Sequence, residues 1–294
     1  MEIKIFYAAL AFFFVSSSFI EYALTYKKYK GYYNMKDTFS SIKLMLAGLV
    51  FDTGIKIVSI YGLLLLTTFA PYHLGYDWWS WILCFVIWDF CFYCKHYVEH
   101  HVRFIWSIHV HHHSSSHMNL STSIRSGVFK GLYRYFFYIP IILMGFPPVM
   151  FFTIYGIGKL WAFFSHSQRL GNWGILEKFL ITPSHHAVHH SYNDQNLNKN
   201  FGETLIIWDK LFGSFQENNG NLKFGIPEQV DHSSFYNTVM HEFENMARDI
   251  RSAKNLKEIM FYIFGKPGWN QKKKHTVKEK NLKNKTNESK NIQV

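Results

Sequence analysis

The sequence predicts an all-α, polytopic integral-membrane bundle with a histidine-rich di-metal cap on the cytoplasmic side. Three observations support this prediction: 48% of the 294 residues are hydrophobic and only 17% are charged, several apolar stretches are long, and most of the 17 histidines fall in two clusters. Soluble domains ordinarily contain about 25% charged residues. The composition therefore favours a membrane protein and excludes disorder for most of the chain.

Four apolar stretches are expected to enter the membrane, because a span needs roughly 20 mostly apolar residues. They are residues 3–24, 42–70, 78–97 and 132–164. The second stretch carries Lys43, Asp52 and Lys56. We therefore expect its first half to lie along the interface while residues 57–70 insert. The third begins with three tryptophans, which is typical of an interfacial aromatic belt.

The fourth apolar stretch is interrupted by Gly-Phe-Pro-Pro at residues 145–148. Its first arm, residues 132–144, would rise only about 20 Å, which is less than the roughly 30 Å hydrocarbon core. The stretch is therefore either a re-entrant hairpin or a pair of tilted spans.

Basic residues set the expected orientation in the membrane. Four lysines lie between residues 27 and 36, whereas residues 71–77 and 145–148 contain no Lys or Arg. Because basic loops stay in the cytoplasm, we expect residues 98–131 and the chain after residue 164 to be cytoplasmic. The membrane itself is either the endoplasmic reticulum or a bacterial inner membrane.

The histidines are clustered at helical spacing. Eight lie in residues 96–117 and five in residues 166–190. They include one HxxxH and two HxxHH boxes, and positions i, i+3 and i+4 share a helix face, so each triplet is expected to offer its imidazoles to one side. Nine imidazoles exceed the four to six ligands of one ion, which predicts two metal ions. The predicted ligands are His96, His100, His109, His112, His113, His166, His186, His189 and His190.

Asp89 is the candidate supporting residue of this site. It lies seven residues before His96 on the same helical stripe, and an ionisable residue in a span is a functional candidate. We expect its carboxylate to accept the N–H of a liganding histidine and fix the tautomer. The alternative is a structural pair with Lys95.

The other histidines and the cysteines have simpler interpretations. Four histidines beside the boxes are expected to support the ligands or face the substrate: His101, His111, His117 and His185. Four more are expected to be ordinary polar residues: His73, His232, His241 and His275. Cys84, Cys91 and Cys94 are expected to be packed thiols.

The sequence contains no HExxH, Glu-x-x-His, GxSxG, P-loop or GxGxxG motif.

With its three histidine boxes in this order, the chain resembles the fatty acid hydroxylase superfamily, which includes sterol desaturases and hydroxylases. Within that superfamily it is most similar to the alkylglycerol monooxygenases, which cleave ether lipids. The segments that carry the similarity are DFCFYCKHYVEH, NLSTSIR, TPSHHAVHH and LIIWDKLFGSF. The resemblance covers roughly residues 35–270.

The resemblance implies a membrane-bound oxidoreductase. The nine histidines would hold two iron ions, and O2 would hydroxylate a C–H bond of a lipid in the bilayer, next to an ether oxygen in the case of an ether lipid. Two electrons would come from a separate donor, either a tetrahydropterin or an electron-transfer protein. The alternatives are a sterol or carotenoid desaturase or hydroxylase and, outside catalysis, a transition-metal transporter or sensor.

The chain is accordingly divided into three parts. Residues 1–78 are expected to form N-terminal membrane helices, and residues 79–270 a fatty acid hydroxylase-type catalytic domain. Residues 271–294 hold eight Lys and two Glu, which is +6 of the formal net charge of +11. We therefore expect a disordered basic tail at residues 271–294 and no nucleic-acid partner.

Overall fold

The computed structural model describes residues 2–29, 31–227, 230–231 and 234–268, with side chains from residue 12 onward. The described part is helical. Its β structure consists of two isolated bridges, Leu180 with Leu205 and Ser191 with Phe224. The all-α prediction is therefore confirmed for these residues. The predicted basic tail, His232 and His275 lie outside the described residues.

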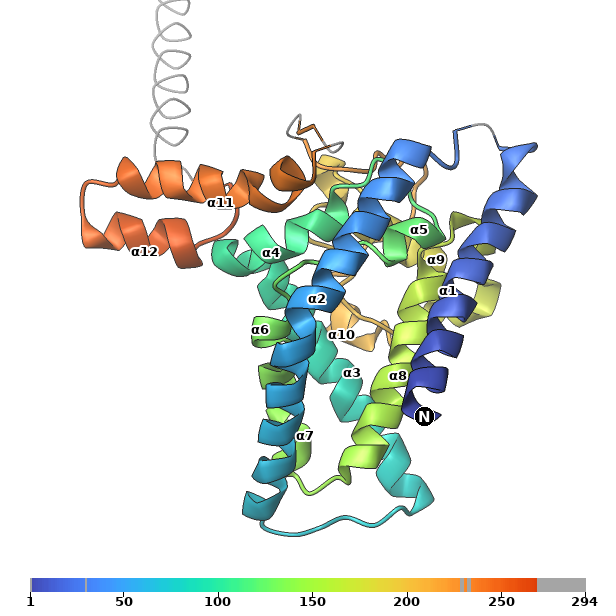
Figure 1. Cartoon of the computed structure of the whole chain (residues 1–294), viewed down its shortest axis with the longest axis vertical. Helices are drawn as coiled ribbons and strands as arrows, with labels where there is room; N and C mark the ends of the chain where they lie inside the picture. The colour runs from blue at the N-terminus through green and yellow to red at the C-terminus, as the bar shows by residue number, and fades with distance from the viewer. Residues whose placement is uncertain (1, 30, 228–229, 232–233, 269–294) are drawn as a thin grey trace, which may run out of the picture.

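Four long helices run along the bundle, and short helices close one end of it (Figure 1). The long ones are α1 (Glu2–Tyr26), α2 (Met35–Leu66), α3 (Trp78–His101) and α8 (Pro148–Ser165). The shorter α-helices are α4 (Arg103–His113), α5 (Leu120–Ser123), α6 (Gly131–Arg134), α7 (Ile139–Leu143), α9 (Pro183–His190), α10 (Ile207–Leu211), α11 (Phe235–Arg251) and α12 (Leu256–Phe264). The 3₁₀ turns are η1 (Thr67–Phe69), η2 (Tyr135–Tyr138), η3 (Gln168–Leu170), η4 (Gly174–Lys178) and η5 (Asp194–Asn196).

Three helices of the described chain are long and apolar enough to cross a membrane: Met35–Phe69, Trp78–His101 and Pro148–Ser165. They correspond to three of the four stretches expected from the sequence. The expected first span forms the 25-residue helix α1, which is not among these three. Membrane insertion of α1 therefore stays a prediction.

Helix α2 begins earlier than the sequence predicts. The expected start was residue 42, but the helix starts at Met35 because the Asn34 side chain caps it, accepting from the backbone N–H of Lys36 at 2.9 Å. Asp52, which suggested an interfacial first half, is buried and accepts the backbone N–H of Gly131 at 3.0 Å. Its charge is thus accommodated inside one continuous helix.

The expected first arm of the fourth stretch is not a regular helix. Residues 131–143 form α6, the 3₁₀ turn η2 and α7 in succession, whereas the second arm is the single helix α8. The break between the arms is a tight turn. Gly145 has a φ of +83°, and a Cβ there would lie 2.1 Å from the carbonyl oxygen of Tyr72, so the position requires glycine.

The core of the bundle lies between α3, α7 and α8. Trp88 of α3 is fully buried, and its ring packs on Gly158 of α8, where a Cβ would come within 2.0 Å of it. Buried residues of η2, α7 and α8 surround this contact, among them Tyr138, Ile141 and Phe151. Two of the three cysteines, Cys84 and Cys91, are free thiols in this core, and Cys94 is free and half-buried.

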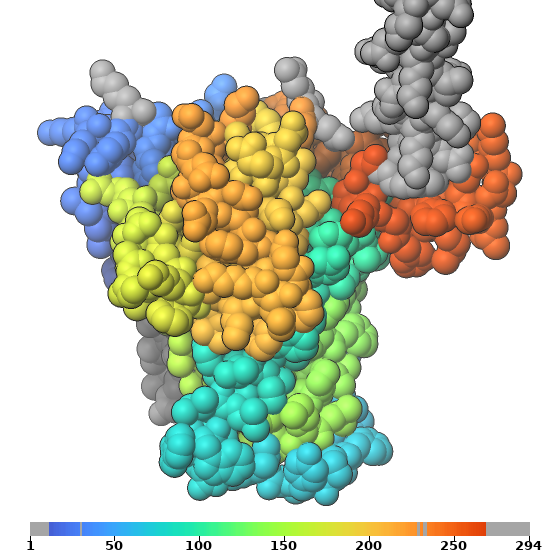
Figure 2. Space-filling model, turned by 180° about the vertical axis from the view of Figure 1, so that it is seen from behind, coloured from blue at the N-terminus to red at the C-terminus, as the bar shows by residue number. Residues whose placement is uncertain are grey.

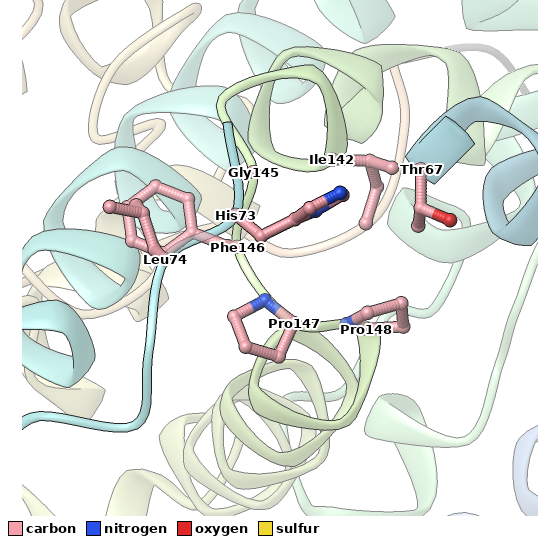
Figure 3. Close-up of a pocket in the computed structure, with 8 residues that line it drawn as sticks. All are labelled: Thr67, His73, Leu74, Ile142, Gly145, Phe146, Pro147 and Pro148. Carbon is pink, nitrogen blue, oxygen red and sulfur yellow. The ribbon is translucent and has the colours of Figure 1, made fainter. Parts of the chain in front are cut away.

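The two loops without Lys or Arg meet at one end of the bundle, opposite the histidine boxes (Figure 1). The N–H of Leu74 donates to the carbonyl of Gly145 at 2.9 Å. Beside this contact lies a half-open pocket of about 250 Å³, lined by His73, Leu74, Phe146 and Pro147 among others (Figure 3). The exposed His73 is therefore remote from the boxes, as an ordinary polar residue would be.

The opposite end is closed by α4, α5 and α9 and by the segment that follows α8. Seen from behind, the chain that follows α9, drawn in orange, covers the middle of this face, and the yellow-green segment that follows α8 lies beside it at the left (Figure 2). The hairpin of α11 and α12 packs on α4, where Arg103 contacts Glu242 at 2.8 Å and Asp249 at 2.6 Å. The histidines are thus enclosed by elements from both halves of the sequence.

Candidate di-metal site

The nine histidines predicted as ligands lie in two adjoining groups. The larger group contains His96, His100, His109, His113 and His189, and the smaller one contains His112, His166, His186 and His190. Within each group, one ring nitrogen of every histidine lies within 4.8 Å of the others. All nine are buried except His112, which is half-buried. This is the arrangement that two neighbouring metal ions require.

Helical periodicity explains how the histidines of the three boxes are distributed between the two groups. Each pair at i and i+4 serves one group: His96 and His100 on α3 enter the larger group, and so do His109 and His113 on α4. On α9, the pair at i and i+4 enters the smaller group. The middle histidine of each triplet, His112 or His189, joins the other group. Each triplet is thus shared between the two adjoining groups, because 100° per residue separates the i+3 side chain from the one at i+4.

Backbone carbonyls fix the tautomer of four of these imidazoles. The Nδ1 atoms of His96 and His189 lie 2.9 and 2.8 Å from the carbonyl oxygens of Phe201 and Lys199. Those of His112 and His166 lie 2.9 and 2.6 Å from the carbonyls of Arg125 and Ala162, in the same way. A carbonyl only accepts, so each Nδ1 carries the proton. Each Nε2 is then left with a free lone pair.

The Nε2 atoms converge at distances that suit bound ions. Nε2 of His166 lies 3.2 Å from Nε2 of His112 and of His186, and His109 and His113 show the same spacing. Two nitrogens bound to one ion at about 2.1 Å would lie about 3.0–3.4 Å apart. Three buried Nε2 atoms have no hydrogen-bond partner: those of His100, His189 and His190. His100 and His189 belong to the larger group and His190 to the smaller one, so each group contains an unpaired buried nitrogen, as a metal site would.

Burial keeps the imidazoles neutral. It lowers the pKa of five of them well below the usual range, and neighbouring imidazoles lower it further: His109, His112, His113, His186 and His190. Burial also lowers the pKa of His166 to about 3 and that of His189 to about 4. Neutral imidazole is the form that binds a metal, so the ligands need no deprotonation at neutral pH.

Residues 81–214 match the family model named fatty acid hydroxylase, and this stretch contains all nine histidines. The chain carries a fatty acid hydroxylase domain. The relatives of this domain include alkylglycerol monooxygenases. That of Homo sapiens is 33% identical over 191 residues, which cover 65% of this chain and 43% of the relative. That of Caenorhabditis elegans is 36% identical over 140 residues, covering 47% of this chain and 27% of the relative.

A bacterial lipid enzyme is also similar to the hydroxylase domain. The ornithine lipid hydroxylase OlsE of Rhizobium tropici is 30% identical over 135 residues, covering 46% of this chain and 41% of the relative. The aligned part of the chain thus spans less than half the length of each of these three relatives. No solved structure matches the chain.

Asp89 of the hydroxylase domain does not lie where the sequence suggested. Its carboxylate contacts no histidine and does not pair with Lys95. It accepts the backbone N–H groups of Thr204 at 3.0 Å and Leu205 at 3.1 Å and the indole N–H of Trp208 at 2.9 Å. The seven-residue spacing from His96 placed Asp89 on the same helix face but two turns away, where it meets residues 204 and 205 of the loop whose Phe201 carbonyl contacts His96.

The carboxylate beside the histidines is Glu99, which the sequence analysis missed. It lies 3.7 Å from Nδ1 of His109 and accepts from Lys95 at 2.7 Å, Lys130 at 3.1 Å and Tyr133 at 2.7 Å. Its place inside the first histidine box, one residue before His100, was the available signal.

Arg125, another missed residue, supports the smaller group. This fully buried side chain donates to Asp37 at 2.6 Å, Ser114 at 2.8 Å and Ser41 at 3.2 Å. It thereby ties α2 to the end of α4, and its own carbonyl accepts from His112. The signal was the NLSTSIR segment, which ends in this arginine.

The four histidines beside the boxes lie outside both groups. His111 points away from the other box histidines and donates from Nε2 to the carbonyl of Val239 at 2.9 Å. His185 contacts Glu177 at 3.8 Å, His117 contacts Ser116, and His101 stacks on Tyr97. His241 bonds the carbonyl of Asn237 on its own helix. None of these five is among the grouped histidines.

Proposed function

We propose that this chain is a membrane-bound di-iron lipid hydroxylase that uses O2, and that its substrate is an ether lipid. The observation that carries the proposal is the pair of adjoining histidine groups inside a fatty acid hydroxylase domain. The alkylglycerol monooxygenase relatives support the ether-lipid assignment. The all-imidazole ligand set suits iron, for which histidine is a common ligand.

The two groups would play different parts in this reaction. Five imidazoles leave at most one position of an octahedral ion open, whereas four leave two. We therefore place the reacting C–H bond nearest the smaller group, His112, His166, His186 and His190. Bound iron would supply the reduction of O2. The chain's own contribution is to hold the ligands neutral, orient them through backbone carbonyls and exclude water by burial.

The reaction balances with an external donor. One O2, two electrons and two protons convert the CH2 group beside the ether oxygen into a hemiacetal carbon, and the second oxygen atom leaves as water. The hemiacetal then breaks into a fatty aldehyde and a glycerol. An ether oxygen weakens the adjacent C–H bond, which makes this position the easiest to oxidise. The two electrons would come from a separate tetrahydropterin or an electron-transfer protein.

The proposed orientation places the histidines on the cytoplasmic side of the membrane. The loops without Lys or Arg lie at the other end of the bundle, and the end of α1 and the start of α2, beside which Lys27, Lys28 and Lys36 lie in the sequence, are at the histidine end (Figure 1). This distribution supports the positive-inside assignment. A lipid in the cytoplasmic leaflet would then reach the site without leaving the bilayer.

A transition-metal transporter is the competing function from another class. It would need ligands distributed along several spans to pass an ion across the membrane. The nine histidines instead form two adjoining groups at one end of the bundle. Their arrangement therefore favours catalysis.

The direct test is turnover of an alkylglycerol in lipid nanodiscs with ferrous iron, a reductant and isotopically labelled O2. We expect a fatty aldehyde that carries one labelled oxygen. Borohydride present during the reaction reduces the aldehyde to a fatty alcohol before the label exchanges with water, and the label is measured in that alcohol. His112→Ala should abolish the product and lower the bound metal. His117→Ala is the matched control, because His117 lies close to His112 in the sequence, just after α4, but outside both groups.

Each other outcome has a defined meaning. Product formation in the absence of O2, or in the folded His112→Ala protein, would overturn the oxygenase proposal. Oxidation of a sterol or a carotenoid in place of the ether lipid would retain the oxygenase and replace the substrate.

A further inference from the structure

One loop contacts only the larger histidine group. Residues 199–205, called the carbonyl loop here, follow α9 and lead into α10. The carbonyl of Lys199 accepts from Nδ1 of His189 at 2.8 Å, and that of Phe201 accepts from Nδ1 of His96 at 2.9 Å. The Phe201 ring also lies 5.2 Å from the ring of His100. Three of the five histidines in the larger group therefore contact this loop.

Asp209 holds the middle of the carbonyl loop. One carboxylate oxygen accepts the N–H of Phe201 at 2.8 Å, and the other accepts the N–H of Gly202 at 2.8 Å. The hydroxyl of Ser214 donates to the same carboxylate at 2.6 Å. Asp209 is fully buried. It therefore holds the two peptide groups that flank the Cα atom of Phe201, and one of them contains the Phe201 carbonyl.

Asp89 holds the end of the same loop. Its two oxygens accept the N–H groups of Thr204 and Leu205 at 3.0 and 3.1 Å, and Trp208 adds an indole N–H at 2.9 Å. Asp89 is also fully buried. Two buried carboxylates thus take four of the loop's N–H groups. Backbone amides can stabilise such charges without any cation.

Two further residues, Asn200 and Gly202, constrain the backbone of the carbonyl loop. Asn200 adopts a φ of +56°, and its side chain bridges the carbonyls of His185 and Gln216 at 3.0 and 2.8 Å. A Cβ at Gly202 would lie 2.6 Å from the carbonyl of Leu205. The two carbonyls are therefore presented to His96 and His189 in one fixed geometry.

The smaller group uses other supports. His112 donates to the carbonyl of Arg125, whose side chain is held by Asp37, and His166 donates to Ala162 on its own helix. None of these contacts involves the carbonyl loop. The two groups therefore have separate hydrogen-bonded supports.

We propose that Asp89 and Asp209 are positioning residues for the metal ion of the larger histidine group alone. They act through the carbonyl loop, which sets the tautomer and ring orientation of His96 and His189. Asp37 has the corresponding role for the smaller group, because it binds the side chain of Arg125, whose carbonyl accepts from His112. The inference rests on the proposed di-metal function and adds that each ion has its own carboxylate support.

The test is a metal titration of the purified full-length chain in detergent. Cobalt(II) is the probe, because its visible absorption reports the ligands around the ion, and equilibrium dialysis gives the number of ions bound. For the unsubstituted chain we expect two tight ions. Asp209→Asn and Asp89→Asn should each weaken one ion by about 10–100-fold and leave the other unchanged. Asp37→Asn should weaken one ion by a similar factor.

The double variants decide whether the supports are separate. Asp209→Asn with Asp37→Asn should weaken both ions, whereas Asp209→Asn with Asp89→Asn should still bind one ion tightly. If Asp209→Asn with Asp37→Asn retains one tight ion, both supports act on the same ion and the proposal is wrong. Equal weakening of both ions by Asp209→Asn alone would also overturn it.

A second kind of variant covers the case in which a carboxylate substitution prevents folding. Gly202→Ala distorts the carbonyl loop without removing a charge, and it should weaken the same single ion as Asp209→Asn. Gly62→Ala on α2 is the control, because a Cβ there meets no atom within 4 Å and the position lies in a helix outside the carbonyl loop. An unsubstituted chain that binds no cobalt would contradict the proposed function itself, and not only the assignment of the supports.

Discussion

The carboxylate of Glu99 lies 3.7 Å from Nδ1 of His109, at the edge of the larger histidine group. Glu99 also contacts the ammonium groups of Lys95 at 2.7 Å and Lys130 at 3.1 Å. Lys95 and Glu99 are almost completely buried. One carboxylate therefore balances two lysines next to a site that would bind two metal cations.

Replacing Glu99 with Gln should destabilise the protein. The amide keeps the shape but leaves the buried ammonium group of Lys95 and the half-buried one of Lys130 without a counter-charge, and breaking a buried ion pair costs about 3–5 kcal/mol. The free energy of unfolding of the metal-free protein, measured by titration with sodium dodecyl sulfate in mixed micelles, should fall by about this amount. Glu244→Gln on the exposed face of α11 should cause no change. An equal effect of the two substitutions would contradict this account.

Two glycines of α8 should respond differently to alanine. At Gly158 the added methyl group would overlap the ring of Trp88, with 2.0 Å between the atoms, and overpacking of this kind costs about 1–3 kcal/mol. At Gly156 no atom lies within 4 Å of the new Cβ. Gly158→Ala should therefore lower the thermal midpoint, and Gly156→Ala should not. Similar midpoints for the two variants would show that Trp88 moves at little cost.

Cysteine labelling in sealed membranes should report the orientation. In a chain without its native cysteines, His73→Cys should react with an impermeant maleimide added from outside. Ser116→Cys should react only after the membrane is permeabilised. Both positions are exposed, and the segment between α2 and α3, which contains His73, lies at the opposite end of the bundle from the turn between α4 and α5, which contains Ser116 (Figure 1). Labelling of Ser116→Cys from outside in intact membranes would reverse the proposed orientation.

Glu21 should hold α1 against the histidine end. Its buried carboxylate accepts the N–H of Leu120 at 2.8 Å and the hydroxyl of Tyr32 at 3.1 Å, and it also contacts Ser167 next to His166. Glu21→Ala leaves these donors unpaired, at about 1–3 kcal/mol for each that stays buried. Hydrogen exchange should accelerate at Leu120 and the following turn. The exposed Glu217→Ala is the control, and unchanged exchange in Glu21→Ala would refute the contact's role.

The sequence by itself determined the features that depend on local periodicity. The apolar lengths predicted α2, α3 and α8, because the hydrocarbon core fixes the length of a span. The spacing of the boxes predicted which histidines come together, because i and i+4 share a face of any helix. The start of α2 and the irregular first arm at residues 131–143 escaped this reasoning. The Asn34 cap and the 3₁₀ turn depend on hydrogen bonds that apolar length does not encode.

Only the tertiary structure decided how the histidines divide and what holds them. His96 and Phe201 are 105 residues apart, and the hydrogen bond between them depends on how the carbonyl loop packs against α3. In the same packing, Asp89 binds the carbonyl loop, and Glu99 is the carboxylate beside His109. Helix spacing had instead suggested that Asp89 contacts a liganding histidine. Periodicity selects the face of a helix on which a residue lies. Which partner covers that face depends on contacts between distant segments, and these form only when the bundle packs.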